Sequence, residues 1–284
     1  MNLRKAGAFE QKRVVVTGAA SGIGRATALA FARAHAELFV CDWSSERLAG
    51  LEAELLAAGA RGALAATVDV GSRTDVANFC ETVCRTGAPD VLVNNAGVGL
   101  AGGLLATDLE DWQWILSANL WGVVHGCHYF APKMAARGRG QIINIASAAG
   151  YYNSEAMTAY GTTKYAVVGL SEGLRAELAP RGVGVSVVCP GFINTPIVAT
   201  MRMRGEAYPE SERANVQLFY QKRNYSPDRV ASAVLSAARH NPALLPVTPE
   251  AWALYAMKRV APRLGPRLLQ AARQFAERRR SSKR

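Results

Sequence analysis

The sequence predicts an α/β protein built on a single doubly wound parallel sheet of about seven strands, with helices on both faces. Short β-branched apolar segments alternate with longer segments in which apolar residues recur at helical spacing. A glycine-rich turn joins the first strand to the first helix. The composition of the 284 residues, 50% hydrophobic and 19% charged, excludes a disordered chain, a collagen and a disulfide scaffold.

The alternation of the expected elements continues almost to the C-terminus. The expected strands cover 13–17, 37–41, 62–68, 90–93, 141–146, 183–189 and 244–247. The expected helices cover 23–35, 45–58, 73–85, 108–137, 157–178 and 227–240. Strands joined by helices run parallel, so these elements predict one sheet. Residues 191–226 show no clear periodicity, and we expect a functional substrate loop there.

The net charge of +11 is concentrated near the C-terminus. Residues 252–284 contain ten of the 33 Lys and Arg but one of the 22 Asp and Glu, which leaves +2 for the remainder. We therefore expect a dinucleotide-binding and catalytic domain over 1–247 and a basic, partly amphipathic helical extension over 248–284. This extension could lie on an anionic membrane surface, or dock against the protein itself or a partner subunit. Nucleic acid is an unlikely partner because the rest of the chain is nearly neutral.

The cysteines and the N-terminal segment indicate the compartment. The five cysteines mostly lie in apolar segments without metal-ligand spacing, which is typical of buried thiols in a reducing environment. No segment has the length and apolarity of a secretory signal or a membrane span. We expect a cytoplasmic protein, with peripheral contact to the inner membrane surface as an alternative. No metal site is expected, since His125 and His128 lack neighbouring ligands.

The first strand leads into the turn Thr17-Gly18-Ala19-Ala20-Ser21-Gly22-Ile23-Gly24. Glycine allows a tight turn that can approach a pyrophosphate, and the helix that follows directs free N–H groups at the anion. A glycine turn alone can be a simple connection, but the strand before it and the helix after it form a Rossmann-type unit. The expected cofactor contacts in this turn are Gly18, Ser21, Gly22, Ile23 and Gly24.

Asp42 ends the second expected strand. A carboxylate there can accept hydrogen bonds from an adenosine ribose and would repel a 2′-phosphate, which predicts NAD rather than NADP. The nearby Arg25 weakens this preference, and Asp42 could also be an ordinary strand-end acid. Asp69 and Val70, at the end of the third strand, are expected to flank the adenine ring.

Tyr160 and Lys164 are four residues apart on an expected helix, so both side chains project from one face. A tyrosine with an ordinary pKa near ~10 is a poor base at neutral pH. An ammonium group about 4 Å away would lower that pKa and allow proton exchange near neutrality. Taken alone, such a pair is more commonly a solvated helix face.

The remaining motifs occur in a characteristic order and resemble those of the short-chain dehydrogenase/reductase family over approximately residues 11–247. They are Asn94-Asn95-Ala96-Gly97 after the fourth strand, Asn119, Ser147 at the end of the fifth strand, Tyr160 with Lys164, and Pro190-Gly191 after the sixth strand. The resemblance implies that Tyr160 is the general acid/base and that Ser147 positions the substrate oxygen. It implies that Lys164 lowers the tyrosine pKa and binds the nicotinamide ribose, while Asn119 holds a water that links the lysine to solvent.

The same resemblance implies the rest of the cofactor site. Asn94, Ala96 and Gly97 match the motif that steadies the sheet and lines the adenosine side, and Asn95 is expected to contact the cofactor. Beside the nicotinamide it places Pro190, Gly191, Ile193 and, for the carboxamide, Thr195. Seen singly, Asn119 could be a packing group, Ser147 a strand-end cap and Pro190-Gly191 a turn.

The candidate substrate residues are mainly apolar or aromatic. They are Ser147, Ala149, Tyr152, Asn153, Tyr160, Phe192 and Met201, with further candidate walls at Val98, Leu100, Tyr151, Met157, Met203 and Tyr208. This lining favours a hydrophobic secondary alcohol or ketone over a charged metabolite. Arg202, Arg204 and Lys222 could instead bring a cation to a carboxylate or carrier phosphate.

The sequence thus predicts an oxidoreductase that transfers a hydride between NAD and a secondary alcohol or ketone, that is, an alcohol dehydrogenase or ketone reductase. One alternative is an NADP-linked ketoacyl or carbonyl reductase. Another is a catalytically silent, dinucleotide-binding regulatory protein. The family resemblance also implies a homodimer or homotetramer assembled through the helices that bear Asn119 and Tyr160.

Overall fold

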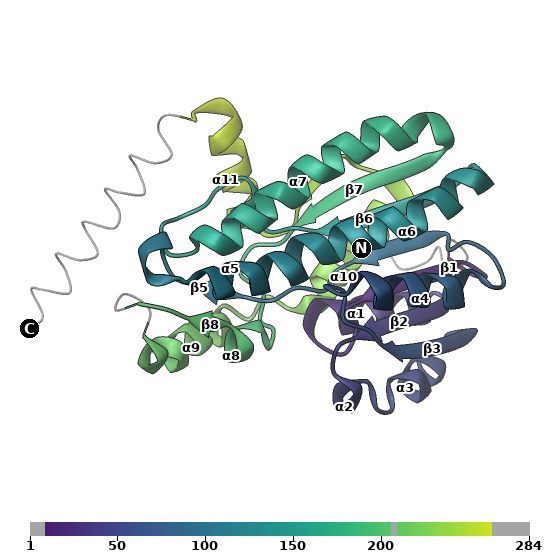
Figure 1. Ribbon diagram of the computed structural model, residues 1–284, viewed down its shortest axis with the longest axis horizontal. Coiled ribbons are helices and arrows are strands. Elements are labelled where there is room, and N and C mark those ends of the chain that lie inside the picture. The colour runs from purple at the N-terminus through teal and green to yellow at the C-terminus, as the bar shows by residue number, and fades with distance from the viewer. Residues whose placement is uncertain (1–8, 206–208, 263–284) are drawn as a thin grey trace, which may run out of the picture.

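A seven-stranded parallel sheet runs through the centre of the computed structural model, which describes residues 9–205 and 209–262 (Figure 1). The strand order is β3-β2-β1-β4-β6-β7-β9, and every pair of neighbours is parallel. The strands are β1 (Arg13–Thr17), β2 (Glu37–Asp42), β3 (Gly62–Thr67), β4 (Val91–Asn94), β6 (Gly140–Ile145), β7 (Val183–Cys189) and β9 (Leu244–Pro246). This topology confirms the predicted doubly wound sheet.

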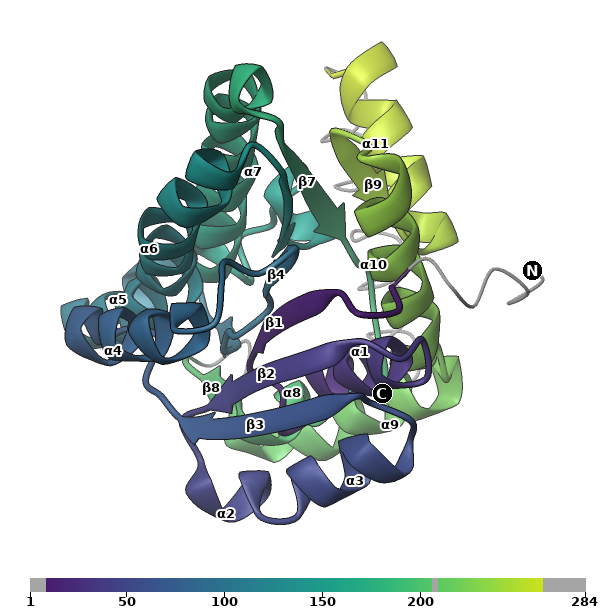
Figure 2. The ribbon, with the colours of Figure 1, turned by 90° about the vertical axis from the view of Figure 1, so that its right-hand side faces the viewer.

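Helices cover both faces of the sheet, as Figure 2 shows. One layer contains α4 (Arg73–Cys84), α6 (Gly122–Arg137) and α7 (Thr158–Leu178), and the opposite layer contains α1 (Gly22–Ala32) and α10 (Pro227–His240). Because successive strand residues point to opposite faces, Val15 packs into the first layer, while Val14 and Val16 pack into the second. The sheet is therefore buried on both sides, which explains its continuous apolar strands.

Two of the predicted helices are interrupted. The helix expected over 45–58 is divided into α2 (Ser45–Leu48) and α3 (Leu51–Ala57), because Gly50 adopts a left-handed conformation with φ of 80°. The helix expected over 108–137 is divided into α5 (Leu109–Leu116) and α6 by a π-helical turn at Ser117–Trp121. Such a turn inserts one residue into the helical repeat and commonly occurs at functional sites. It contains Asn119.

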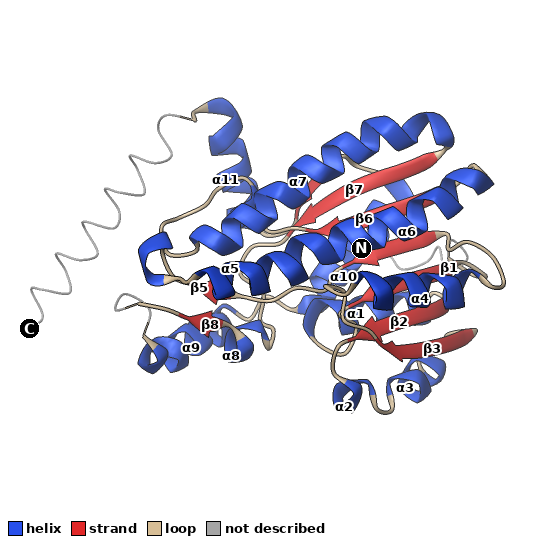
Figure 3. Ribbon diagram, viewed as in Figure 1, coloured by secondary structure: helices blue, strands red, loops and turns tan. Residues whose placement is uncertain are grey.

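The stretch at 191–226, hereafter the cover segment, is more regular than expected. Its described parts form α8 (Ile197–Thr200), β8 (Arg202–Met203), a short 3-10 turn at Glu210–Glu212 and α9 (Arg213–Arg223). Strand β8 pairs with β5 (Leu100–Ala101) in a small second sheet. Helix α9 has no fully buried residue, so its sequence lacks the strong apolar periodicity that predicts a helix. These elements lie beyond the carboxyl ends of the central strands (Figure 3).

Helix α11 (Pro249–Val260) follows the last strand and packs on the body of the protein. The Thr248 hydroxyl caps it by accepting a hydrogen bond from the Ala251 N–H, and the Tyr151 hydroxyl donates to the Ala251 carbonyl at 2.8 Å. The start of the predicted extension is therefore in contact with the predicted catalytic domain. The amphipathic helix expected after Pro266 lies outside the described residues. Within the described residues, no helix combines the length and apolarity needed to cross a membrane.

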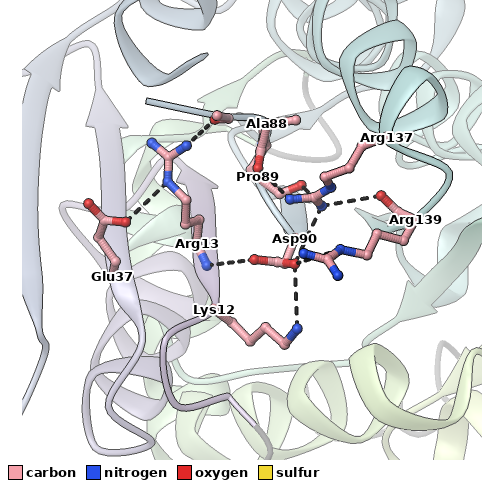
Figure 4. Close-up of polar contacts among 9 residues, drawn as sticks. Lys12, Arg13, Glu37, Ala88, Pro89, Asp90, Arg137 and Arg139 are labelled. Atoms are coloured by element: carbon pink, nitrogen blue, oxygen red, sulfur yellow. Dashed lines mark hydrogen bonds and ion pairs between the residues drawn. The ribbon is translucent and has the colours of Figure 1, made fainter. Parts of the chain in front are cut away.

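The amino ends of three central strands are fixed around Asp90 (Figure 4). Its Oδ2 accepts a hydrogen bond from the Arg13 N–H at 3.0 Å. Its Oδ1 lies 3.5 Å from Lys12 Nζ and 3.4 Å from Arg137 Nη2, with Arg139 Nε at 3.9 Å. This cluster joins the starts of β1, β4 and β6. The carboxyl ends of the strands lie on the opposite side, where residues from several strand ends line a cavity.

Gly126 permits the close approach of α6 to β4, since a Cβ there would lie 2.2 Å from Asn94 Oδ1. Gly126→Ala should lower the free energy of unfolding by about 1–3 kcal/mol through overpacking. The matched control is Gly173→Ala on the exposed side of α7, where a Cβ would meet nothing within 4 Å. It should raise stability by roughly 0.5–1 kcal/mol. Urea unfolding measures both, and equal stabilities for wild type and Gly126→Ala would contradict the packing.

Candidate active site

A cavity of about 1200 Å³ lies at the carboxyl ends of the central strands. Residues from several strand ends line it, including Gly18 after β1, Asp42 of β2, Asn95 after β4, Ser147 after β6 and Pro190 after β7. Open parallel sheets bind ligands at this edge, in the crevice where the strand order reverses on either side of β1. The fold therefore brings together groups that are far apart in sequence.

The glycine turn is packed so closely that larger residues do not fit. A Cβ on Gly24 would lie 2.0 Å from the Gly18 carbonyl oxygen, and one on Gly18 would lie 2.7 Å from Ala96 Cα. The Asn95 side chain holds the turn by donating to the carbonyls of Thr17 and Gly18 at 2.9 and 3.1 Å. Ser21 precedes α1 without a side-chain cap, so the first N–H groups of the helix are left for an anion. This arrangement fits the pyrophosphate of a dinucleotide.

Asp42 is buried beside this turn, where its carboxylate accepts N–H groups from Ala20 at 3.1 Å and Ser44 at 3.2 Å. Each oxygen accepts one of these bonds, and a carboxylate oxygen can accept a second from a ribose hydroxyl. Asp69 and Val70 also line the cavity, and their expected contact with an adenine ring remains a prediction.

The predicted counter-cation near Asp42 is wrong. Arg25 forms an exposed ion pair with Glu54 and does not line the cavity. Arg47 lines it instead, with its guanidinium 6.0 Å from the centre of the Trp43 ring. Arg47 lies on α2, five residues after Asp42, and no sequence motif marks it. Arg47 reaches the cavity because the start of α2 folds against the end of β2.

The Asn94-Asn95-Ala96-Gly97 segment serves both the sheet and the cavity. Asn94 points into the sheet and donates to Asn144 Oδ1 at 2.9 Å. The N–H groups of Asn95 and Ala96 both donate to the Thr17 hydroxyl at 3.0 Å. At Gly97, a Cβ would come within 3.0 Å of Asn119 Oδ1. Asn95, Ala96 and Gly97 line the cavity, in agreement with their expected location.

The four candidate catalytic residues lie close together. Ser147, Tyr160 and Lys164 line the cavity, and Asn119 is buried behind it. The Ser147 hydroxyl donates to the Pro190 carbonyl at 3.5 Å, a weak bond, and accepts the Ala149 N–H at 3.1 Å. The Ser147 hydroxyl hydrogen can therefore turn toward a ligand at the cost of only one weak hydrogen bond.

Burial controls the protonation of Tyr160 and Lys164. Burial raises the pKa of Tyr160, the hydrogen bond with the Ser147 side chain lowers it, and the net pKa is raised. Burial lowers the pKa of Lys164 to about 8. Lys164 Nζ donates to the Ile145 carbonyl at 3.1 Å and lies 5.7 Å from the centre of the Tyr160 ring. Burial thus outweighs the hydrogen bond from Ser147 at the phenol. The expected lowering of the tyrosine pKa by Lys164 remains a prediction.

Cys189, at the end of β7, lies near both groups. Burial raises the pKa of its thiol to about 12. Cys41, Cys80 and Cys127 are likewise buried, and Cys84 is partly exposed. Within the described residues, no three His, Cys, Asp or Glu side chains are grouped to hold a metal ion.

Both polar atoms of the Asn119 side chain form hydrogen bonds with other protein groups. Its Oδ1 accepts the Val98 N–H at 2.7 Å, and its Nδ2 donates to the Val98 carbonyl at 3.0 Å and to Thr163 Oγ1 at 3.3 Å. The π-helical turn thus orients an amide that fixes the loop after β4. The expected role of Asn119 in holding a water remains a prediction.

The expected nicotinamide segment lies on the same side of the cavity as the start of α11. Pro190, Gly191, Ile193 and Thr195 all line the cavity. A Cβ on Gly191 would lie 2.2 Å from Thr248 Oγ1 and 2.6 Å from Glu250 Oε1. Glycine is needed there because α11 approaches so closely. Thr195 packs against Gly22, where a Cβ would lie 3.3 Å from Thr195 Cβ.

The substrate end of the cavity contains every residue of the main candidate set, and Val98 and Met157 line it as well. Four of the further candidates do not line it as described. Tyr151 is buried and directed to the Ala251 carbonyl, while Leu100 and Met203 are buried in the small second sheet. Tyr208 lies outside the described residues. Sequence reasoning missed wall residues from α5, α9 and α11, which are Glu110, Gln113, Trp114, Tyr220, Glu250 and Leu254.

The two arginines of the cover segment are not directed at a substrate. Arg202 Nη1 lies 2.9 Å from Asp111 Oδ1, and Arg204 Nε lies 2.7 Å from Asp111 Oδ2. Burial raises the pKa of Asp111, but the hydrogen bonds from Arg204 and Arg202 outweigh it and lower the net pKa. The Arg202 guanidinium also stacks 4.0 Å from the centre of the Trp114 ring. Lys222, the third candidate cation, is exposed and does not line the cavity. The expected alternative, a cation delivered from Arg202, Arg204 or Lys222, is not supported.

A glycine turn, a strand-end acid and a Ser/Tyr/Lys cluster at one edge of a parallel sheet define a dinucleotide-binding α/β protein. Residues 12–205 match the family described as short chain dehydrogenase. The chain belongs to this family, the short-chain dehydrogenases/reductases, and is an oxidoreductase by family.

Individual relatives agree with this assignment. The chain is 42% identical over 267 residues to "Probable oxidoreductase EphD" of Mycobacterium tuberculosis, covering 91% of this chain but 45% of that protein. It therefore spans less than half the length of this relative. It is 35% identical to the "3-oxoacyl-[acyl-carrier-protein] reductase FabG" of Thermotoga maritima, covering 81% of this chain and 91% of that protein.

A solved structure extends the likeness to three dimensions. A short-chain dehydrogenase/reductase from Burkholderia phymatum, determined in complex with NAD, superimposes with a TM-score of 0.80 at 31% identity. The match covers 88% of this chain and 94% of that chain.

The buried Lys164 amine makes a testable contribution to stability. Its folded pKa of about 8 lies below the ordinary 10.5, so the unfolded chain binds more protons between these values and stability rises with pH. Relative to Lys164→Met without cofactor, the wild type should therefore gain up to about 3 kcal/mol as the pH rises through this window. Urea unfolding of both proteins across the window measures the difference. A stability difference between the two proteins that does not change with pH would contradict burial of the Lys164 amine.

Proposed function

We propose that the protein transfers a hydride between NAD and an apolar secondary alcohol or ketone. The observation that carries this proposal is the placement of Ser147, Tyr160 and Lys164 on one cavity that joins a glycine turn to a mainly apolar end. The cavity can hold a dinucleotide and a substrate together. A bound nicotinamide supplies the acceptor or donor of the hydride, and the chain supplies orientation and proton transfer.

Each side chain has a defined task in this proposal. The raised pKa keeps the Tyr160 phenol protonated at neutral pH, so that it can donate its proton to the oxygen of a ketone. The Ser147 hydroxyl donates a second hydrogen bond to the same oxygen. Lys164 provides an amine that is near its own pKa at neutral to mildly alkaline pH and can hold a ribose hydroxyl. In alcohol oxidation, Tyr160 must first lose its own proton to solvent, and the resulting phenolate then accepts the proton of the alcohol.

The preference for NAD is supported by Asp42, which is buried at the adenosine end with no nearby lysine or arginine bonded to it among the described residues. A 2′-phosphate would meet this carboxylate. The similar structure from Burkholderia phymatum contains NAD, which agrees with this preference.

An apolar substrate is supported by the walls of the cavity. Ala149, Tyr152, Met157, Phe192 and Met201 are apolar or aromatic and line the substrate end. Arg202 and Arg204, the cations that follow Met201 in the sequence, are already paired with Asp111. A substrate carboxylate would therefore have to break an existing ion pair.

An NADP-linked ketoacyl or carbonyl reductase is the second candidate. Arg47 on the cavity wall favours it because a guanidinium can bind a 2′-phosphate, and the Thermotoga maritima relative carries a ketoacyl reductase name. A silent regulatory protein is disfavoured, since the Ser147, Tyr160 and Lys164 set is complete.

We further propose that the protein is a cytoplasmic homodimer or homotetramer. Leu109, Trp121 and Tyr165 are exposed on α5, the π-helical turn and α7, the helices expected to form the subunit interface. The basic extension would contact a partner subunit or an anionic membrane. Sedimentation equilibrium gives the subunit number, and a monomer at micromolar concentration would reject the assembly. Flotation with anionic vesicles before and after removal of residues 263–284 tests the membrane contact.

Tyr160→Phe should abolish the redox reaction while the fold is retained, because only the phenolic hydroxyl group is removed. We expect kcat to fall by about 10²-fold or more in a screen of apolar alcohols and ketones followed by reduced-nicotinamide absorbance. NAD binding, measured by fluorescence titration, should persist. Wild-type inactivity across the screen would reject the proposed function, and an active Tyr160→Phe would reject the proton assignment.

Asp42→Ala should shift cofactor preference toward NADP, because it removes the repelling charge and leaves Arg47. The ratio of kcat/KM for NADP over NAD should rise by about tenfold or more, the equivalent of ~1.4 kcal/mol. Adding Arg47→Gln should reverse much of this gain. Glu46→Ala is the matched control, since it removes an exposed acid from the same segment outside the cavity. An unchanged ratio in Asp42→Ala would reject the role of Asp42.

A further inference from the structure

Tyr220 brings a second phenol to the cavity that contains Tyr160. It comes from α9 in the cover segment, and its ring packs edge-on against Phe192 with centroids 5.7 Å apart. Phe219 completes this aromatic cluster, 5.4 Å from Phe192. The Tyr220 hydroxyl forms no hydrogen bond with any described residue. A tyrosine in a partly buried site usually finds a partner for its hydroxyl, so this group is available to a ligand.

Helix α9 is tied to the rest of the cover segment at its first residue and just beyond its last. The Arg213 guanidinium donates to the carbonyls of Val198 and Met201 at 2.5 and 2.8 Å. Past the other end, the Tyr225 hydroxyl donates to the Val247 carbonyl at 3.0 Å, and the Tyr225 carbonyl accepts the Asn194 N–H at 3.0 Å. The position of Tyr220 is thus set by side-chain and backbone contacts at the first residue of its helix and just beyond its last.

Glu250 joins α9 to the loop that carries Phe192. One carboxylate oxygen accepts the Phe192 N–H at 3.2 Å, and the other is paired with Arg223, the last residue of α9. Burial raises the pKa of Glu250, but its hydrogen bonds, including those from Phe192 and Arg223, lower it. The net pKa is lower than that of an ordinary glutamate. Glu250 therefore remains charged at neutral pH and holds together the two elements that present Phe192 and Tyr220.

The protonation state of Tyr220 decides what it can recognise. Burial raises the pKa of this phenol, and the neighbouring Tyr160 raises it further. Tyr220 is therefore a neutral O–H donor at physiological pH. The apolar rings of Phe192 and Phe219 around it lack hydrogen-bond acceptors of their own. A ligand oxygen at this point would gain a donor in a partly desolvated site.

We propose that Tyr220 is a specificity-determining residue that donates a hydrogen bond to a second oxygen of the substrate, and that Glu250 positions it through Arg223. The substrate class is then an apolar secondary alcohol or ketone with another oxygen close to the reacting carbon. This inference rests on the proposed oxidoreductase function. Tyr220 contacts the substrate, whereas Arg223 acts through Tyr220. Glu250 also lines the cavity, but its two carboxylate oxygens are bonded to the Phe192 N–H and to Arg223, so it too acts through Tyr220.

The test compares matched ketones that differ by one oxygen, such as 2-hydroxycyclohexanone and cyclohexanone, within a wider panel of such pairs. Tyr220→Phe keeps the ring and removes the hydroxyl. It should lower kcat/KM by about tenfold for the oxygenated member of a pair and by less than about twofold for the plain member. NAD affinity should stay unchanged, because the Tyr220 hydroxyl faces the substrate.

The positioning role has its own readout. Arg223→Gln and Glu250→Gln should raise KM for the oxygenated ketone with a smaller effect on kcat, and Arg223→Lys should restore part of the loss. Combining Arg223→Gln with Tyr220→Phe should cause no further loss, since both remove one contact. Lys222→Gln, an exposed neighbour on the same helix, is the charge-matched control and should behave as wild type.

The outcomes separate this inference from the proposed function. Wild-type turnover with equal losses for both members of each pair in Tyr220→Phe would reduce Tyr220 to a packing residue and overturn the inference alone. Unchanged kinetics in Tyr220→Phe would do the same. Absence of wild-type turnover on the whole panel would overturn the proposed function and this inference with it.

Discussion

The burial of the Lys164 amine beside the Tyr160 phenol is the constraint on which the site depends. An amine inside the protein needs a hydrogen-bond acceptor, and the Ile145 carbonyl at the end of β6 provides one. Helix α7 is thereby held against the strand end, and Tyr160, one turn earlier on the same helix, is held at the cavity wall. Desolvation acts in opposite directions on the two groups, so it favours a neutral amine and a neutral phenol.

A second requirement is that the walls of the cavity stay in place around these groups. The turn after β1 is fixed by Asn95, the loop after β4 by Asn119, and the segment after β7 by Glu250. All three contacts use a side chain to satisfy backbone groups that strand ends leave unpaired. The reactive side chains can therefore be exposed to a ligand while the loops that carry them remain ordered.

Most of the fold and the cofactor edge could be predicted from the sequence because local patterns determine them. The strand 183–189 and the helix 227–240 match the observed bounds of β7 and α10, since each has a strong apolar period and clear end signals. Residues next to strand ends, such as Ser147 and Asp42, were placed correctly because parallel topology sends all strand ends to one edge.

What could not be predicted depends on contacts between distant segments. Asp111 neutralises Arg202 and Arg204 across roughly ninety residues of chain, and no spacing rule predicts that pairing. Tyr151 and Tyr152 are adjacent and chemically alike, yet Tyr151 is in the core and Tyr152 is at the cavity. The π-helical turn at Asn119 adds one residue to a helix whose apolar pattern is otherwise continuous.

The neutral Cys189 thiol has a chemical consequence for an enzyme of this kind. Peroxides and electrophiles attack thiolates rather than thiols, and burial keeps the sulfur beside Tyr160 and Lys164 in the unreactive form. A buried sulfur atom close to the candidate catalytic residues is thus protected from oxidative damage. Because the protonated thiol carries no charge, it does not form an ion pair with Lys164.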